Sequence, residues 1–361
     1  MKEVQRCQPL LDVLRDPARM ATLALRDWDL LLRQSAAAGL LPRIAMQADE
    51  LGLNARVPDA VRPHLTAART LANKQRQAVR WEARRLARAL AKIDGPVLLL
   101  KGAAYAIADL PPAAGRLFGD IDILVPHPQL GQVEAALMLA GWHTQKQDDY
   151  DQRYYRRWMH ELPPMTHIRR GTVLDVHHSL LPETARIRTQ AAPILAAAQA
   201  LADPPGLNIP ANTDLVLHSA CHLFHEGEWG HGLRDLVDLD ALLRAFATEP
   251  TFWSTLLIRA KTLNLGRPLY YALDCCQRWL HTPIPPNVIA DCPHRPPGWQ
   301  RAIMRNLFDA GLGSAHQSCH GRVPKLATFA LYIRGHYLRM PWHLLLPHLL
   351  HQARRRNQEQ G

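Results

Sequence analysis

The 361-residue sequence lacks the marks of several large protein classes. Its six cysteines are scattered without a Cys-x-x-Cys pair, which argues against a zinc knuckle and favours reduced thiols in a cytoplasm. No run of about 18 or more apolar residues occurs, so we expect no membrane span. The N-terminal stretch MKEVQRCQPLLDVLRD has no long apolar core, so we expect no signal peptide. Internal repeats are also absent.

The composition describes a helix-rich chain with an excess of positive charge. Apolar residues make up 47% of the sequence, which is enough to bury a sizeable core in one to three domains. The formal net charge of +11 favours acidic partners such as nucleotides, nucleic acid, an acidic peptide or an anionic surface. Charge alone does not choose among these partners.

Two carboxylates stand two residues apart at the start of an apolar strand. Short β-favouring runs bounded by turn residues predict strands at Pro96–Leu100 and Ile121–Val125. Side chains two apart on a strand share a face, so Asp120 and Asp122 point the same way. Like charges repel unless a cation lies between them, and Mg²⁺ prefers oxygen ligands. The alternative is that Asp120 begins a turn and Asp122 is exposed on an edge strand.

Two neighbouring features favour the metal interpretation. Lys101 and Gly102 form a turn between the first strand and an expected helix, and such a junction presents backbone N–H groups that suit a phosphate. The run Thr172–Leu180 predicts another strand with Asp175 at its centre and His177 on the same face. Asp175 would complete a group of three carboxylates.

These separated pieces resemble the bacterial uncharacterised nucleotidyltransferase family, within the superfamily that has a DNA-polymerase-β-like palm. The resemblance also extends to Asp27–Gly52 and His218–Leu243. Ala103 departs from the superfamily, which usually has serine after the glycine, and His178 stands where an aromatic residue is common. The pieces that carry the resemblance are Leu99–Gly102, Arg116, Gly119–Val125 and Leu174–His178.

The resemblance implies an α+β fold with a small mixed-sheet nucleotidyltransferase palm between two helical regions. We expect an N-terminal helical region at 1–95, the palm at 96–180 and a C-terminal helical region at 181–361. A crossover helix is predicted at Pro128–Gly141 with Leu139 on its buried side, and the proline-rich run Leu201–Pro210 is predicted to be a linker.

The resemblance further implies transfer of a nucleoside monophosphate from an NTP to a hydroxyl-bearing acceptor, with release of pyrophosphate. Asp120, Asp122 and Asp175 would be catalytic and would hold Mg²⁺ or Mn²⁺. Asp175 could also accept the proton of the acceptor hydroxyl, with His177 either orienting it or serving only in the core. The residues predicted to contact the nucleotide are Lys101, Gly102, Arg116, Arg234 and Asp238.

The acceptor and the activity itself are less well defined. We rank a protein, peptide or small molecule above RNA as acceptor, because the chain shows no recognised RNA-binding module. One alternative function is a catalytically silent nucleotide-binding or scaffold module, which the alanine at position 103 favours. Another is a metal-dependent phosphohydrolase, which would need no acceptor.

Basic residues recur along the long helix predicted at Ala67–Lys92. They form either a solvated face or a groove for an anionic acceptor. Arginine and tyrosine are interleaved in Asp151–Arg157, which is an exposed hairpin strand or a segment that stacks on a nucleotide or a strand of nucleic acid. The C-terminal tail is a packing helix or a membrane-surface contact, without stable membrane insertion. The basic residues of the long helix are Arg76, Arg80, Arg84, Arg88 and Lys92.

The histidine-rich region after residue 217 has two interpretations. His218 and His222 lie four residues apart, but His-Glu-x-x-His is absent, so no zinc-protease site is expected. Arg234 and Asp238 are also four apart and would form either a helix ion pair or, with His222, a face toward the nucleotide.

Overall fold

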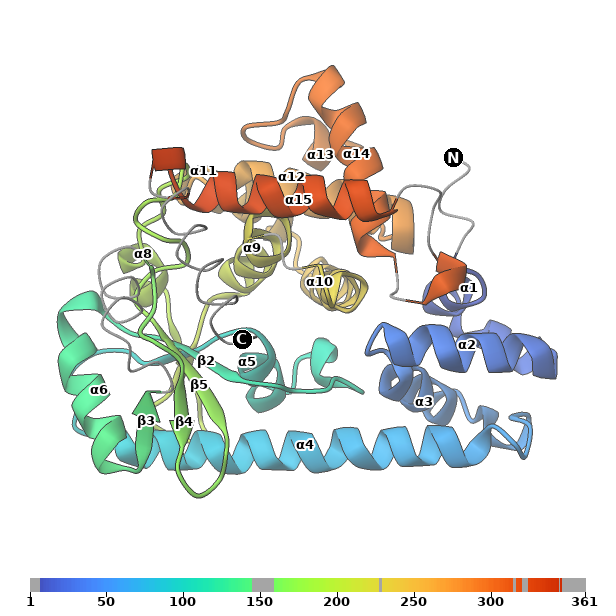
Figure 1. Ribbon diagram of the computed structural model, residues 1–361, viewed down its shortest axis with the longest axis horizontal. Helices are drawn as coiled ribbons and strands as arrows, with labels where there is room; N and C mark the ends of the chain where they lie inside the picture. The colour runs from blue at the N-terminus through green and yellow to red at the C-terminus, as the bar shows by residue number, and fades with distance from the viewer. Residues whose placement is uncertain are drawn as a thin grey trace, which may run out of the picture.

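The computed structural model describes residues 7–144, 159–226, 229–313, 316–319, 324–343 and 345. A small mixed sheet lies between the long helix α4 (Arg62–Ala89) and the helices of the C-terminal half, as Figure 1 shows. The predicted α+β architecture with helical regions on both sides of a mixed sheet is therefore confirmed. Domain boundaries near residues 95 and 180 stay predictions. The segment 151–157 and most of the C-terminal tail lie outside the described residues.

Among the described residues, seven short strands form the sheet in the order β3-β4-β5-β2-β1-β7-β6. The pairs β2–β5 and β1–β7 are parallel, and the other neighbours are antiparallel. The strands are β1 (Leu98–Leu99), β2 (Ile121–Leu124), β3 (Trp142–Thr144), β4 (Met165–His167), β5 (Val173–His177), β6 (Gln199–Ala200) and β7 (Asn208–Ile209).

The two central strands β2 and β5 have the alternation that the sequence predicts. Ile121 and Ile123 on β2 are almost completely buried and belong to the core. β2 lies between β1 and β5, so the alternative that Asp122 sits on an edge strand is wrong. In the parallel register Asp122 lies directly beside Asp175. This register brings carboxylates from two strands to one face of the sheet.

Helices from the first ninety residues build one side of the molecule. The helix α4 runs along the lower edge in Figure 1, and α3 packs on it beside the other N-terminal helices. The N-terminal helices are α1 (Leu10–Arg15), α2 (Leu25–Ala37), α3 (Leu41–Glu50) and α4.

The basic residues of α4 are largely matched by acids on neighbouring segments. Arg76 and Arg80 both form ion pairs with Asp109, and Arg84 pairs with Asp203 at 2.6 Å. Arg88 and Lys92 are exposed, and α4 ends at Ala89, before Lys92. The structure favours the solvated, ion-paired face over a groove for an anionic acceptor.

The C-terminal half is helical and packs above the sheet in Figure 1. The helix α9 continues into a single π-helical stretch at His222–Glu226, a rare geometry that is frequent at functional sites. No helix among the described residues is long and apolar enough to cross a membrane. The helices are α8 (Ala192–Ala196), α9 (Asn212–Cys221), α10 (Gly232–Phe246), α11 (Phe252–Thr262), α12 (Gly266–Leu280), α13 (Pro286–Ala290), α14 (Gly298–Leu312) and α15 (Pro324–Arg339).

Three local predictions differ from the structure. The helix after β1 is α5 (Lys101–Ile107). It begins at Lys101, so Lys101 and Gly102 belong to the helix and do not form a separate turn before it. The crossover helix is α6 (Leu130–Leu139). Val133 and Leu137 are buried in it, but Leu139 at its end is 92% exposed, so the prediction that Leu139 lies on the buried side is wrong. The predicted linker Leu201–Pro210 instead contains the turn of the β6–β7 hairpin and the strand β7, which pairs with β1.

A buried ion pair ties α4 to the turn between β4 and β5. Glu82 on α4 is 3% exposed and accepts hydrogen bonds from the guanidinium of Arg170, with Arg170 Nε 2.9 Å from Oε2. Hydrogen bonds to a charged partner at a buried site contribute more than surface ion pairs do. This contact therefore fixes the sheet against the long helix.

We expect the substitution Glu82→Gln to lower the free energy of unfolding by about 1–3 kcal/mol, because it removes the charge that binds Arg170. The matched control is Asp59→Asn, whose carboxylate is 90% exposed in a pair with Arg62 and should change stability by no more than about 0.5 kcal/mol. Urea unfolding measures both. Equal effects of the two substitutions would contradict the account.

Candidate functional site

Three carboxylates meet where β2 begins and β5 runs beside it. Asp120 comes just before β2 and is exposed, while Asp122 is 5% exposed within the strand. One carboxylate oxygen from each of Asp120, Asp122 and Asp175 lies within 4.8 Å of the others. The structure thus brings together the three acids that the sequence singled out.

Asp122 is held by two cationic groups on the same oxygen. Lys101 Nζ donates to Asp122 Oδ1 at 3.2 Å, and His177 Nε2 donates to that oxygen at 3.1 Å. Burial by itself would raise the pKa of Asp122, but Lys101 and His177 outweigh it and hold the pKa well below its usual range. Asp122 is therefore ionised at neutral pH.

His177 lies between two carboxylates. Its Nε2 contacts Asp122, and its Nδ1 lies 3.3 Å from Oε2 of Glu161. Burial opposes a charge on the ring, but the hydrogen bond to Asp122 and the field of Glu161 raise the pKa of His177. Of the two roles considered for His177, these contacts argue against the orientation of Asp175, because the two ring nitrogens contact Asp122 and Glu161.

Asp175 has the opposite electrostatic environment to Asp122. Its Oδ1 is buried and has no hydrogen-bond partner among the described residues. Burial, followed by the negative charges of Asp122 and Glu161, raises the pKa of Asp175 to about 7. In the described part of the chain, Asp175 therefore lacks a cationic hydrogen-bond partner of the kind that Lys101 provides for Asp122.

A cleft of about 530 Å³ opens in front of Asp120 and Asp122. Its walls combine cationic side chains with acids, an arrangement suited to a ligand that carries both phosphates and a metal ion. Asp175, which pairs with Asp122 on the neighbouring strand, is not among the wall residues. The polar side chains on the walls are Lys101, Tyr105, Arg116, Asp120, Asp122, Ser219, His222, His231, Arg234, Asp235 and Asp238.

Asp238 anchors the far side of the cleft between two arginines. Arg116 Nε donates to Asp238 Oδ2 at 2.7 Å, and Arg43 Nη2 lies 3.5 Å from Oδ1. All three side chains are at most 10% exposed. Arg116 therefore enters the cleft in a fixed position, as part of a buried network and not as a mobile surface cation.

Arg234 does not pair with Asp238. It contacts the neighbouring Asp235 instead, with Nη2 2.9 Å from Oδ1, so the predicted ion pair between residues 234 and 238 is wrong. Arg234, Asp238 and His222 all line the cleft, which agrees with the other interpretation, that this region faces the bound ligand.

Gly102 is required for close packing and not for a turn. A Cβ atom at this position would lie 2.3 Å from Nη1 of Arg116, so the absence of a side chain at residue 102 lets the guanidinium group lie close to this backbone. The left-handed backbone occurs one residue earlier, where Lys101 has φ +43°. A non-glycine residue in this region is strained, and such strain is concentrated at functional sites.

Among the residues that sequence reasoning missed are Glu161 and Arg43, which hold the charged groups of the site in place. Glu161 reaches His177 through an isolated bridge outside the named strands, and Arg43 comes from α3, far away in the sequence. The sequence around Arg43 gave one indication, because this arginine stands among the apolar residues that form the buried face of α3. Glu161 carried none, since it follows a stretch with no clear strand pattern.

The raised pKa of Asp175 predicts a pH-dependent stability without divalent ions. The folded protein keeps a proton on Asp175 up to about pH 7, whereas the usual pKa is 3.8. The folded state therefore binds more protons than the unfolded state between these values, and the free energy of unfolding falls as pH rises through this range.

We expect Asp175→Asn to stabilise the protein at pH 8 by up to about 4 kcal/mol, at about 1.4 kcal/mol per pKa unit, because it removes the repelling charge. At pH 5, which is about 1.2 units above the usual pKa, the advantage of the variant should fall to about 1.7 kcal/mol. Urea unfolding in EDTA at both pH values measures the difference, and the titration of His177 cancels because both proteins contain it. A stability difference that is the same at pH 5 and pH 8 would refute this assignment.

The comparison with protein families agrees with the geometry of the site. The family described as "Uncharacterised nucleotidyltransferase" matches residues 24–281, which include α2, the sheet, the three carboxylates and the cleft. No curated protein matches the chain. The family match covers more than two thirds of the 361 residues, and the chain belongs to the uncharacterised nucleotidyltransferase family.

Proposed function

We propose that the protein is a metal-dependent nucleotidyltransferase. It would move a nucleoside monophosphate from an NTP to a hydroxyl group of an acceptor and release pyrophosphate. The observation that carries this proposal is the meeting of Asp120, Asp122 and Asp175, with oxygens within 4.8 Å, beside a cleft lined by cations. Membership of the nucleotidyltransferase family supports the same reaction class.

The carboxylate group fits a divalent metal ion. Its donors are all oxygens, which Mg²⁺ and Mn²⁺ prefer, and Asp175 contributes a buried oxygen without a partner among the described residues. Asp120, Asp122 and Asp175 would hold the ion. When bound, it would offset the charge of the phosphates and of the carboxylates themselves.

The remaining wall residues would position the nucleotide. Lys101 now neutralises Asp122, and its ammonium group would turn toward a phosphate when another cation occupies the carboxylates. Arg116 is held by Asp238, so its guanidinium would meet the phosphates in one orientation. Gly102 lets Arg116 reach this position, and Arg234 offers a further cation on the cleft wall.

Asp175 is the candidate for proton removal from the acceptor hydroxyl. Without a metal ion its pKa is raised to about 7, and a bound cation would favour the ionised form, which is the form that can accept a proton. Lys101 and His177 hold the pKa of Asp122 well below its usual range, which makes Asp122 too weak a base for the same role. The two acids would divide their tasks, with Asp122 holding charge and Asp175 accepting the proton.

A second groove offers a place for the acceptor. It measures about 480 Å³, shares Gly119 and Asp120 with the cleft, and is lined by the aromatic side chains of Trp81 and Phe118. An acceptor held there would present its hydroxyl beside Asp120. The aromatic and apolar lining suits a protein side chain, a peptide or a small molecule, which we rank above RNA.

The position of Ala103 is the observation that favours a silent module. Ala103 is buried and does not line the cleft, so this turn supplies no hydroxyl for a phosphate. Ser219 on α9 is the serine on the cleft wall, and its hydroxyl bonds to Tyr105. Product analysis distinguishes transfer from this alternative.

The test incubates the full-length protein with each of the four NTPs, labelled at the α- or the γ-phosphate, with Mg²⁺ and a cell extract as the source of acceptors. We expect α-label on an acceptor after denaturation and γ-label in pyrophosphate. Asp122→Asn should reduce transfer by at least about a hundredfold, because removal of an essential charge from a transition state costs several kcal/mol.

The control is Asp109→Asn, which removes a surface carboxylate that pairs with Arg76 and Arg80 on α4. It should transfer label at the wild-type rate. Release of phosphate or nucleoside monophosphate without a labelled acceptor would indicate a phosphohydrolase. Nucleotide binding without any product would indicate the silent module, and full transfer by Asp122→Asn would refute the assigned site.

A further inference from the structure

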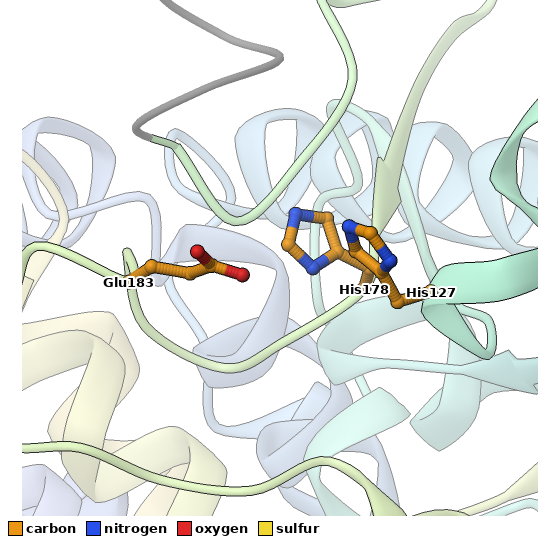
Figure 2. Close-up of side chains that lie close together, drawn as sticks. All are labelled: His127, His178 and Glu183. Carbon is orange, nitrogen blue, oxygen red and sulfur yellow. The ribbon is translucent and has the colours of Figure 1, made fainter.

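A second group of metal-ligating side chains lies outside the cleft. His127, His178 and Glu183 each offer one ligand atom, and these atoms lie within 4.8 Å of one another. In Figure 2 the carboxylate of Glu183 points toward the two imidazole rings. None of the three residues is among those that line the nucleotide cleft.

The parallel pairing of β2 and β5 explains why the two histidines meet. His127 follows β2 in the short helix η5 (His127–Gln129), and His178 is the first residue after β5. The two parallel strands end side by side, and the hydrogen bond from Val125 N to His177 O extends their pairing beyond β2. Successive side chains alternate, so His178 points away from the face that His177 and Asp122 share.

The environment of each side chain suits metal ligation. The rings of His127 and His178 are 4.6 Å apart and nearly perpendicular. The ring of His178 is also hydrogen-bonded to the backbone of Met159, a contact that commonly fixes the orientation of a ligating imidazole. Glu183 is exposed and has no arginine or lysine ion-pair partner among the described residues. A carboxylate next to two imidazoles is thus left without a cation.

We propose that His127, His178 and Glu183 bind a zinc ion. Two imidazole nitrogens and one carboxylate oxygen form a donor set that suits Zn²⁺, whereas Mg²⁺ takes oxygen ligands. Zinc would hold the ligand atoms about 3.3–3.6 Å apart at its usual bond lengths of about 2.0–2.2 Å. The exposed side chains of His127 and Glu183 can close that distance by rotation, and a water molecule would complete the tetrahedron.

The zinc ion would pin together the ends of the two strands that carry the catalytic acids. It would link the segment after β2, the end of β5 and the loop that holds Glu183. None of the three ligands lines the cleft beside the carboxylates, so the site is independent of the proposed transfer reaction. A bound zinc ion should raise the stability of the folded state, because the unfolded chain does not hold the three ligands together.

The test measures zinc bound to the full-length protein after removal of metals with a chelator and dialysis against zinc chloride. Excess Mg²⁺ is present throughout to compete for the carboxylates of the cleft. We expect one zinc ion per wild-type chain and a higher melting temperature. His127→Ala and Glu183→Gln should each weaken zinc binding by at least about tenfold, and both replace exposed side chains, so the fold should persist.

Three control variants locate the ion. His143→Ala removes an exposed histidine on β3, and Asp122→Asn removes a carboxylate of the cleft; both should bind zinc as wild type does. Glu161→Gln reports on the other nearby group, His160, Glu161 and His177, and should also leave zinc binding unchanged. Wild-type protein without zinc, unaltered binding by Glu183→Gln, or loss of zinc in Glu161→Gln or Asp122→Asn would each overturn the proposal.

Discussion

The placing of two carboxylates side by side in the centre of a sheet is the constraint on which the site depends. Asp122 and Asp175 occupy paired positions on parallel strands, and both are largely shielded from water. Two negative charges in such a place repel and lose hydration, so each needs compensation. The chain compensates Asp122 through Lys101 and His177, and it leaves Asp175 to take a proton or a cation.

The surroundings of Asp122 follow from this need. Lys101 adopts a left-handed backbone at the end of β1, where its ammonium group reaches the neighbouring strand. His177 is in turn balanced by Glu161, so cationic and anionic groups alternate from Lys101 through Asp122 to Glu161. The same logic recurs across the cleft, where Asp238 is shared by Arg43 and Arg116.

Asp238 also shows that the cleft is built from distant parts of the chain. Arg43 comes from α3, Arg116 precedes β2, and Asp238 lies on α10. Each belongs to a different one of the three regions that the sequence suggested. Removal of the shared carboxylate would leave two buried guanidinium groups without their partner, so the cleft wall depends on contacts among all three regions.

The sequence predicted those parts of the site that local periodicity encodes. Asp120, Asp122 and Asp175 could be placed because strand side chains alternate and turn residues bound the runs. The predicted pairing of Arg234 with Asp238 was wrong. An ion pair within a helix contributes only a few tenths of a kcal/mol. The buried carboxylate of Asp238 needs stronger compensation, and Arg43 and Arg116 from other parts of the fold supply it. Arg43 and Glu161 were missed because contacts over such sequence distances leave no local pattern. Leu139 shows the same limit. The sequence does not show whether another segment packs on the end of a helix, so it could not predict that Leu139 is exposed.

The most direct test of the account is the thermal stability of the protein with ATP, GTP, CTP and UTP, each with and without Mg²⁺, for wild type and Asp122→Asn. The account predicts that at least one NTP raises the melting temperature of wild type only with Mg²⁺, because a ligand that binds the folded state stabilises it. The same nucleotide should give no shift in the variant, while the exposed Asp109→Asn control keeps the shift. A well-folded wild-type protein that responds to no nucleotide, or a variant that responds as wild type does, would contradict the central claim.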